Sequence, residues 1–367
     1  MMRYPIAPGR PVVVKVGSSS LTSSGGIDDA AISAVVDQVA GVWNTGRPVA
    51  LVTSGAVAAG LPALGLTSRP TEVVDLQVAA AVGQGRLMAR YIDAFDARGI
   101  VAGQVLLTKA VLADRDQYLH ARQALERMMT QRIVPIVNEN DTVAIEELKI
   151  GDNDRLAALV SHLVSAGLLV LLTDTPGLLT SDPRVDVSAE LLTAVRHTDQ
   201  ILDRLAAGGA GPLGSGGIAT KVAAARMAAW SGVPTVVASA SDHTAVETAV
   251  AGEDIGTWVG PQPSRLPARK LWIAFGQPAE GSIGIDAGAV HAIVEGGRSL
   301  LPVGVTTVIG EFSPGAAVEI AGPSGAIVAK GVTRLGSGEL RRVAGLRSDV
   351  AGGEVVHRDD LVVLVGR

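Results

Sequence analysis

Apolar runs alternate with stretches of helical period over the first 260 residues. Six runs are apolar nearly throughout, as expected of parallel strands covered on both faces. They are "VVVKV" (12–16), "PVALVTS" (48–54), "IVAGQVLL" (100–107), "IVPIVN" (133–138), "LLVLLTD" (168–174) and "PTVVA" (234–238). Apolar spacings of three and four predict helices over 28–45, 73–98, 154–165 and 220–231. The alternation predicts an open, mainly parallel α/β sheet sandwiched by helices.

The pattern changes after residue 260. The stretch "GPQPSRLPARK" holds three prolines and three basic residues and predicts a linker over 261–278. From 279 to 367 the chain consists of glycine-punctuated short runs with frequent turn signals, which predict a small β-rich barrel or sandwich. We therefore expect a first domain over 1–260 and a second over 279–367.

Composition narrows the class of protein. The 367 residues carry a formal net charge of −5, which gives no global basic field for nucleic acid or an anionic membrane. The chain has no cysteine, so disulfides, thiolate nucleophiles and cysteine-ligated zinc are excluded. The first ten residues lack the apolar core of a secretory signal, and a cytoplasmic location is expected. The uncharged run 156–172 is interrupted by His162 and Gly167, and no membrane span is expected.

Polar residues follow directly after the predicted strands. In open α/β sheets, ligands bind beyond the carboxyl ends of the strands, so we expect these residues to share one rim. They are Gly17 to Ser20, Ser54-Gly55, "NEND" (138–141) and Thr173-Asp174.

Two lysines and several glycine-rich loops indicate an anionic ligand. Lys15 lies near the end of a buried strand, where its ammonium must either meet an anion at the rim or reach solvent at the edge of the sheet. The loop "GPLGSGGIATK" (211–221) opens a helix beside Lys221 and suits a polyphosphate, although it matches neither a Walker loop nor a dinucleotide fingerprint. Few acid–base or nucleophilic groups accompany them. This set suits phosphoryl transfer, in which positioning and charge neutralisation supply most of the catalysis.

Three of the polar stretches have a second interpretation. Ser54-Gly55 can bind an anion or form an ordinary strand–helix turn. Asp174 can meet a ribose, an amine or a lysine, or hold the Pro-Gly turn that follows. "GDND" (151–154) fails the calcium-loop pattern because Leu156 stands at the third ligand position, which leaves a substrate cage or a helix cap.

Six stretches, taken together, resemble a known family in their order and spacing. They are "KVGSSSLT", "VTSGAVAAG", "PIVNEND", "IGDND", "LLTDTPGLLTSDPR" and "GSGGIATKVAAA". The chain resembles the glutamate 5-kinases of the amino acid kinase family, and its C-terminal part resembles the PUA domain found in many bacterial members. The resemblance implies transfer of the γ-phosphoryl group of ATP to the side-chain carboxylate of L-glutamate, the first step of proline biosynthesis. It also implies Mg²⁺, a homo-oligomer (dimer or tetramer) and feedback inhibition by proline.

The resemblance also implies roles for individual residues. Lys15 and Lys221 would neutralise the transferring phosphoryl group, and Asp154 would hold their ammoniums in place. The glutamate-binding positions are Ser54, Asn138, Asp141, Asp152 and Asn153. The ATP-binding positions are Lys15, Thr173, Asp174, Ser215, Gly216, Gly217, Ile218, Ala219, Thr220 and Lys221. The sequence departs from the family pattern at Leu179, where an aromatic is frequent, and at Ser215 and Ala219, which replace Thr and Ser. These departures concern nucleotide affinity, and no residue is assigned as a direct Mg²⁺ ligand.

Three alternatives compete with this interpretation. Another member of the same family would act on acetylglutamate, aspartate, carbamate or UMP, but the paired "NEND" and "GDND" and the PUA-like tail favour glutamate. An RNA-binding protein is disfavoured because residues 279–367 hold eight Lys or Arg against ten Asp or Glu, with Phe312 as their only aromatic. An NAD-dependent dehydrogenase would need a glycine fingerprint and a ribose-binding acid that the chain lacks.

Overall fold

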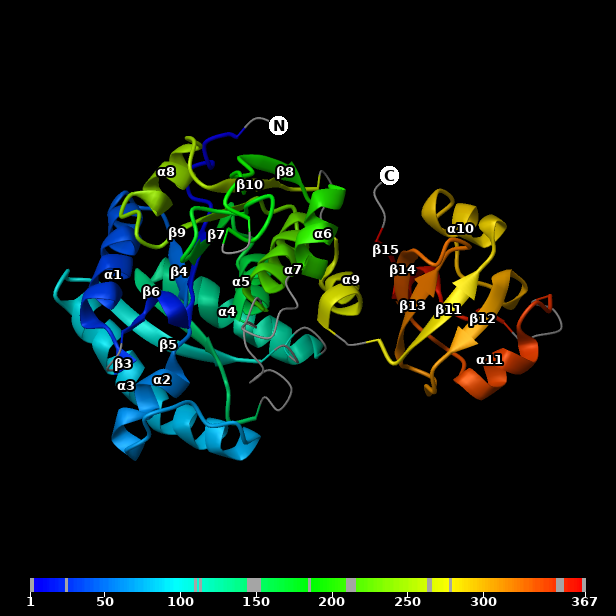
Figure 1. The fold of residues 1–367 in the computed structure, drawn as a ribbon, viewed down its shortest axis with the longest axis horizontal. Coiled ribbons are helices and arrows are strands. Elements are labelled where there is room, and N and C mark those ends of the chain that lie inside the picture. Colours follow the sequence, from blue (N-terminus) through cyan, green and yellow to red (C-terminus); the bar gives the residue numbers. More distant parts are fainter. Residues whose placement is uncertain are drawn as a thin grey trace. The chain divides into compact units, whose positions relative to one another are not determined.

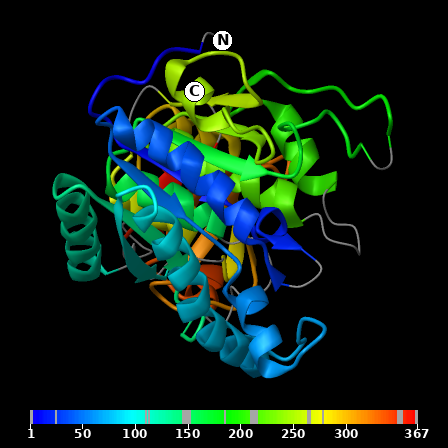
Figure 2. The same cartoon turned by 90° about the vertical axis from the view of Figure 1, so that its left-hand side faces the viewer.

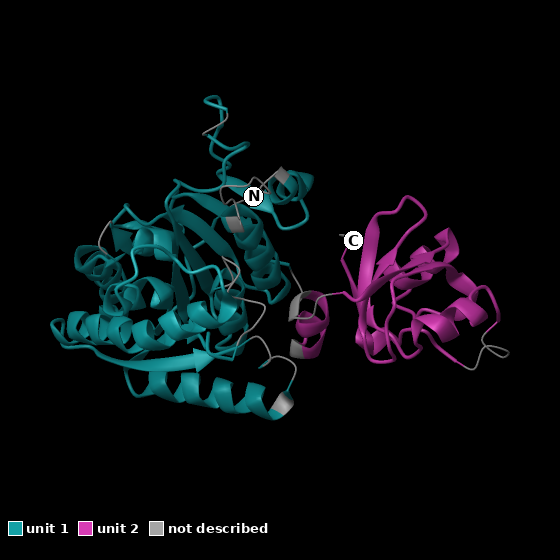
Figure 3. Cartoon of the chain, turned by 60° about the horizontal axis from the view of Figure 1, so that its bottom comes forward, with its two compact units in different colours: residues 1–265 teal, residues 266–367 magenta. Residues whose placement is uncertain are grey.

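The computed structural model describes residues 3–23, 26–108, 111, 114–143, 153–183, 186–208, 216–262, 266–276, 279–347 and 353–364. The chain forms two compact units, residues 1–265 and 266–367, which are described separately (Figure 3). Helix α9 (Ala268–Leu271) and the π-helical turn η4 (Trp272–Gly276) occupy part of the predicted linker. The domain bounds derived from the sequence stay predictions.

Unit 1 is built on an eight-stranded sheet in the order β5-β6-β4-β1-β7-β9-β10-β8 (Figure 1). Its strands are β1 (Val12–Val16), β4 (Val49–Val52), β5 (Val101–Leu107), β6 (Ile133–Glu139), β7 (Leu168–Thr173), β8 (Ala194–Arg196), β9 (Thr235–Ser239) and β10 (Thr257–Gly260). Every neighbouring pair is parallel except β9 and β10. Strands β2 (Thr22–Ser23) and β3 (Gly26–Ile27) form a separate antiparallel pair. The predicted open, mainly parallel sheet is confirmed.

Helices cover both faces of this sheet (Figures 1 and 2). They are α1 (Asp29–Asn44), α2 (Ala56–Gly60), α3 (Val73–Asp96), α4 (Arg115–Thr130), α5 (Asn153–Leu163), α6 (Gln200–Gly208), α7 (Gly216–Trp230) and α8 (Ala245–Ala251), with the 3₁₀ turns η1 (Ser18–Ser20) and η2 (Pro62–Leu64). The start of α1 is fixed by Asp28, whose carboxylate accepts from the N–H groups of Ala30 and Ala31. Helices α1, α3 and α8 share one buried apolar cluster with the sheet, and α5 packs against α7.

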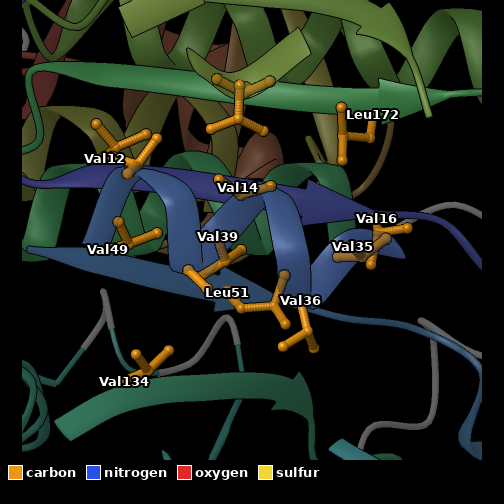
Figure 4. Packing of buried hydrophobic residues seen from close by; sticks show 14 of the residues in the cluster. Val12, Val14, Val16, Val35, Val36, Val39, Val49, Leu51, Val134 and Leu172 are labelled. Atoms are coloured by element: carbon orange, nitrogen blue, oxygen red, sulfur yellow. The ribbon is translucent and has the colours of Figure 1, made fainter. Parts of the chain in front are cut away.

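Side-chain alternation along β1 separates the core from the site. Val12, Val14 and Val16 belong to one apolar cluster with residues of α1, and Val35 of α1 is seen beside Val16 (Figure 4). Successive strand residues point to opposite faces, so Lys15 points to the other side of the sheet. That side is covered by α5, which contacts β1. The strand therefore places the Lys15 ammonium on the α5 face, while Val12, Val14 and Val16 pack into the apolar cluster on the opposite face.

Unit 2 is β-rich. Its five-stranded sheet has the order β12-β11-β13-β14-β15, with β11 and β13 parallel and the other pairs antiparallel. The elements are β11 (Gly281–Ile285), α10 (Ala287–Val294), η5 (Pro302–Gly304), β12 (Val305–Ile309), β13 (Ala317–Ala321), β14 (Ile327–Val332), α11 (Ser337–Val343), η6 (Arg358–Asp360) and β15 (Leu361–Val363). The unit has its own buried apolar core, which includes Ile283, Val318 and Ile320. Across the described parts of both units, no helix is long and apolar enough to span a membrane.

Candidate active site

The carboxyl ends of four parallel strands, β1, β4, β6 and β7, open into one cavity of about 550 Å³. Residues that follow these strands, or end them, line its wall. They are Gly17, Ser18, Ser19, Ser54, Gly55, Asn138, Glu139, Asp141, Thr173 and Asp174. The prediction that the strand-end loops share one rim is confirmed.

Asp154, in the first turn of α5, lies between two lysine ammoniums. Its Oδ1 is 2.6 Å from Lys15 Nζ, and its Oδ2 is 3.4 Å from Lys221 Nζ. Thr220 Oγ1 donates a hydrogen bond to the same Oδ2 at 2.9 Å. Only 1% of Asp154 and 4% of Lys15 are exposed. Two cations and one anion thus form a buried group with an excess positive charge, which favours an anionic ligand.

Burial is the largest influence on the protonation of this group. It lowers the pKa of Lys15 below the usual lysine value, and the neighbouring charge of Lys221 acts in the same direction while Asp154 opposes it. Burial alone would raise the pKa of Asp154, but the charges of both lysines and the hydrogen bonds from Lys15 and Thr220 outweigh it, so this pKa lies below the usual range. The carboxylate is therefore ionised at neutral pH.

The first turn of α7 forms a further part of the wall. Gly217, Ile218 and Lys221 line the cavity, and Lys221 Nζ also donates to the carbonyl oxygen of Gly217 at 3.4 Å. The beginning of a helix offers unpaired N–H groups and the positive end of the helix dipole. Combined with the lysine ammonium, this turn suits the oxygens of a phosphate chain.

Asn153, the residue before Asp154, contacts a different set of groups. Its Nδ2 lies 2.7 Å from the carbonyl oxygen of Thr53, 2.9 Å from Ser54 Oγ and 2.8 Å from Asn138 Oδ1. These partners stand at the ends of β4 and β6. The start of α5 therefore links two halves of the cavity. One half holds amide and hydroxyl side chains, and the other holds Lys15, Lys221 and Asp154, which we call the lysine group.

The turn that carries Ser54 is held by backbone packing. Gly55 has φ +106°, a left-handed conformation that a residue with a side chain rarely adopts. Directly after it, α2 lies against α3, and a Cβ on Gly83 would overlap the carbonyl oxygen of Ala56. A Cβ on Gly60 would likewise overlap the carbonyl of Ala79. Only glycine at these positions lets the two helices approach so closely.

At the end of β7, Thr173 is buried and Asp174 is exposed. Thr173 Oγ1 donates to Asp174 Oδ1 at 3.0 Å, and both residues line the cavity. Leu179, at the position where the family often has an aromatic, is buried and forms a backbone bridge with Leu191. It is not among the residues that line the cavity in the described part of the chain.

The structure brings most of the expected residues to one place. Gly216, Ala219 and Thr220 lie in the first turns of α7, and Thr220 contributes through its bond to Asp154 rather than by lining the cavity. Asp152 and Ser215, expected at the glutamate and ATP sites, lie outside the described residues.

Three charged residues of the wall, Glu139, Arg69 and Asp182, had no role of their own in the sequence analysis. Glu139 was expected on the rim only as part of "NEND", at the end of β6. Asp182 lies in the quoted stretch that follows β7. Arg69 belongs to the loop between η2 and α3, which has no local pattern to distinguish it.

Comparisons with known proteins give matches over nearly the whole chain. A sequence model described as "Amino acid kinase family" matches residues 10–239, and one described as "PUA domain" matches residues 281–350. The chain is similar to proteins named glutamate 5-kinase from Moorella thermoacetica and Marinomonas sp., each at 43% identity, and from Burkholderia multivorans at 44% identity. Each of these matches covers 99% of this chain and 98 to 100% of the relative.

Among solved structures, the chain is similar to the aspartate kinase from Synechocystis. The TM-score is 0.49 at 21% identity, over 75% of this chain and 44% of that one.

Proposed function

The chain belongs to the amino acid kinase family, among the glutamate 5-kinases that carry a PUA domain, and on this premise we propose that it transfers the γ-phosphoryl group of ATP to the side-chain carboxylate of L-glutamate. The product is L-glutamyl 5-phosphate, in the first step of proline biosynthesis. Family membership confirms the resemblance seen in the six sequence stretches. The observation that carries the assignment to this cavity is the placement of Asp154 between the ammoniums of Lys15 and Lys221 on its wall.

The reaction needs no general base. The γ-carboxylate of glutamate has an ordinary pKa of about 4.3 and is already ionised at neutral pH. One of its oxygens forms a bond to the γ-phosphorus, while the bond from that phosphorus to the β,γ-bridging oxygen breaks and ADP leaves with its electron pair. No proton is transferred in this step. Accordingly, no histidine is among the described residues that line the cavity.

Lys15 and Lys221 supply the charge stabilisation. The transferring group spreads negative charge over its equatorial oxygens and the leaving oxygen, and two fixed ammoniums at this position lower the energy of that state. Asp154 keeps both cations in place without proton exchange, because it stays ionised. Its negative charge also makes it less costly to bury two lysines together.

The amide and hydroxyl half of the cavity suits the amino acid end of glutamate. Asn153 Nδ2 is already bonded to protein acceptors, so the group that this side chain has left for a ligand is its Oδ1. That oxygen and the Asp141 carboxylate suit the α-ammonium. Ser54 Oγ accepts from Asn153, and its own proton is then free to reach the α-carboxylate.

ATP is expected to bring Mg²⁺ with it. In the described part of the chain, no cluster of three or more His, Asp or Glu side chains could hold a metal ion. The cavity wall offers separate carboxylates, Glu139 and Asp174, which fit an ion held mainly by phosphate oxygens and water. When bound, Mg²⁺ would neutralise charge on the phosphate chain. Asp174, at the end of β7 beside the expected ATP site, would contact its water shell.

A hydroxylamine trapping assay tests the proposal. An acyl phosphate reacts with hydroxylamine to give a hydroxamate, which forms a coloured complex with ferric ion. The assay is run with ATP and L-glutamate, L-aspartate or N-acetylglutamate. We expect hydroxamate and an equal amount of ADP with L-glutamate only, and less of both as L-proline is added. Product from L-aspartate or N-acetylglutamate in place of L-glutamate would reassign the substrate. Gel filtration of the same preparation tests the proposed homo-oligomer.

A further inference from the structure

A chain of hydrogen bonds leads from the glutamate half of the cavity to a residue that does not line it. Asn153 Nδ2 donates to Asn138 Oδ1 at 2.8 Å, and Asn138 Nδ2 donates in turn to Gln84 Oε1 at 2.7 Å. Gln84 belongs to α3, whereas Asn138 ends β6 and Asn153 begins α5. Three elements that are distant in sequence are thus joined by three side-chain amides.

The orientation of the Asn138 amide is fixed from one side. Its Oδ1 accepts from Asn153 Nδ2 and also from the backbone N–H of Glu139 at 3.0 Å. Reversing the amide would place its NH₂ group against both donors, so the oxygen must face them. The NH₂ group then faces α3. Asn138 is 1% exposed, and a buried donor without an acceptor is costly.

Gln84 meets this need by presenting an acceptor. Its Oε1 faces Asn138, whereas its Nε2 is buried and makes no hydrogen bond among the described residues. The side chain therefore acts through its oxygen alone. Its reach is set by the adjacent Gly83, which lets α3 pack directly against the backbone of α2 at Ala56.

We infer that Gln84 is a positioning residue for glutamate binding: its Oε1 holds Asn138, Asn138 holds Asn153, and Asn153 presents its Oδ1 and the Ser54 hydroxyl to the substrate. The inference rests on the proposed function, since it assigns glutamate to this half of the cavity. It predicts that loss of the Gln84 acceptor weakens glutamate binding. Among the described residues, no side-chain hydrogen bond joins Asp154 or the two lysines to this chain of amides, so phosphoryl transfer itself should be little affected.

Steady-state kinetics of Gln84→Met and Gln84→Glu test the inference. Methionine keeps the length of the side chain without the acceptor, and glutamate keeps the acceptor. We expect Gln84→Met to raise KM for glutamate by about five- to tenfold, the order of one hydrogen bond, with kcat and KM for ATP within about twofold. Gln84→Glu should stay near the wild type. The same change at the exposed Gln104 of β5 is the matched control.

An Asn138→Ala background separates action through Asn138 from a general effect on folding. If Gln84 acts through Asn138, Gln84→Met should cause no further weakening there. For variants whose turnover is too slow to assay, glutamate binding is measured by the increase in unfolding temperature when L-glutamate is added. An unchanged KM for glutamate in Gln84→Met, equal damage by Gln84→Glu, or an undiminished effect in the Asn138→Ala background would overturn the inference. A wild-type protein that gives no hydroxamate from L-glutamate would instead refute the proposed function.

Discussion

Replacing Asp154 by asparagine tests the reasoning about the lysine group most directly. Asparagine has almost the same volume and can still accept from Thr220, so the change removes mainly the negative charge. Lys15 would then keep a buried ammonium with no anion, beside the second ammonium of Lys221. Removing one partner of a buried ion pair costs about 3 to 5 kcal/mol, and we expect a loss of this size in the unfolding free energy of unit 1 at pH 7.

The pH dependence of this loss has a definite sign. Burial lowers the folded-state pKa of Lys15, and Asp154 is the group that raises it, so the pKa falls further in Asp154→Asn. The folded variant prefers the neutral amine. The loss of unfolding free energy in the variant is therefore largest below the folded-state pKa of Lys15. It becomes smaller as pH rises toward the usual lysine pKa of 10.5. In the wild type, the pKa of Asp154 is lower in the folded state than its usual value of 3.8. This difference stabilises the fold at pH values above 3.8, and the stabilisation is lost as pH falls through the folded-state pKa.

Urea unfolding followed by tryptophan fluorescence measures this effect, because three of the four tryptophans, Trp43, Trp230 and Trp258, lie in unit 1. Asp93→Asn, at an exposed position of α3, is the matched control. We also expect kcat to fall by about 10²-fold, since both lysines lose their orientation. A variant within about 1 kcal/mol of the wild type at pH 7, or a deficit that grows as pH rises, would refute the argument.

Two further predictions concern Lys221 and the packing of α3 against α2. Lys221→Ala should lower kcat by about 10²-fold while destabilising the fold less than Asp154→Asn, because the closer ion pair of Asp154 remains; an ADP-release assay with unchanged turnover would contradict it. Gly83→Ala should destabilise unit 1 by about 1 to 3 kcal/mol and raise KM for glutamate, because its Cβ overlaps the Ala56 carbonyl on α2. Gly85→Ala, in the same helix but facing open space, should stabilise by about 0.5 to 1 kcal/mol, and thermal unfolding of the pair decides.

The central strands could be predicted because they are buried on both faces. The runs predicted at 12–16 and 133–138 coincide with β1 and β6 to within one residue. Strands β8 and β10, of three and four residues, were not predicted, since so short a segment shows no periodicity. Helix α4 was also missed. Most of its surface is exposed. Its buried Leu125 and Met129, four residues apart, and its N-cap, Asp114, were readable signals.

The residues of the candidate site, like the elements of the fold, could be predicted only in part. The rule that ligands bind beyond the carboxyl ends of strands placed Ser54, Asp141 and Thr173 on one rim without knowledge of the fold. Sequence spacing could not show that Asp154 reaches both lysines, which the family resemblance supplied. Gln84 had no signal at all. It is one polar residue in a long helix, and its contact with Asn138 depends on how closely α3 packs, which is a property of the assembled structure.

The two halves of the site meet at adjacent residues for a geometric reason. Successive residues of a helix are rotated by about 100°, so Asn153 and Asp154 leave the first turn of α5 in different directions. One contacts the ends of β4 and β6, and the other contacts β1 and α7. The separation between the amide group and the lysine group is thus set by one helical turn rather than by a loop. A substrate whose acceptor carboxylate lies too near its α-carbon would bind one group without reaching the other, which is how this arrangement would discriminate glutamate from aspartate.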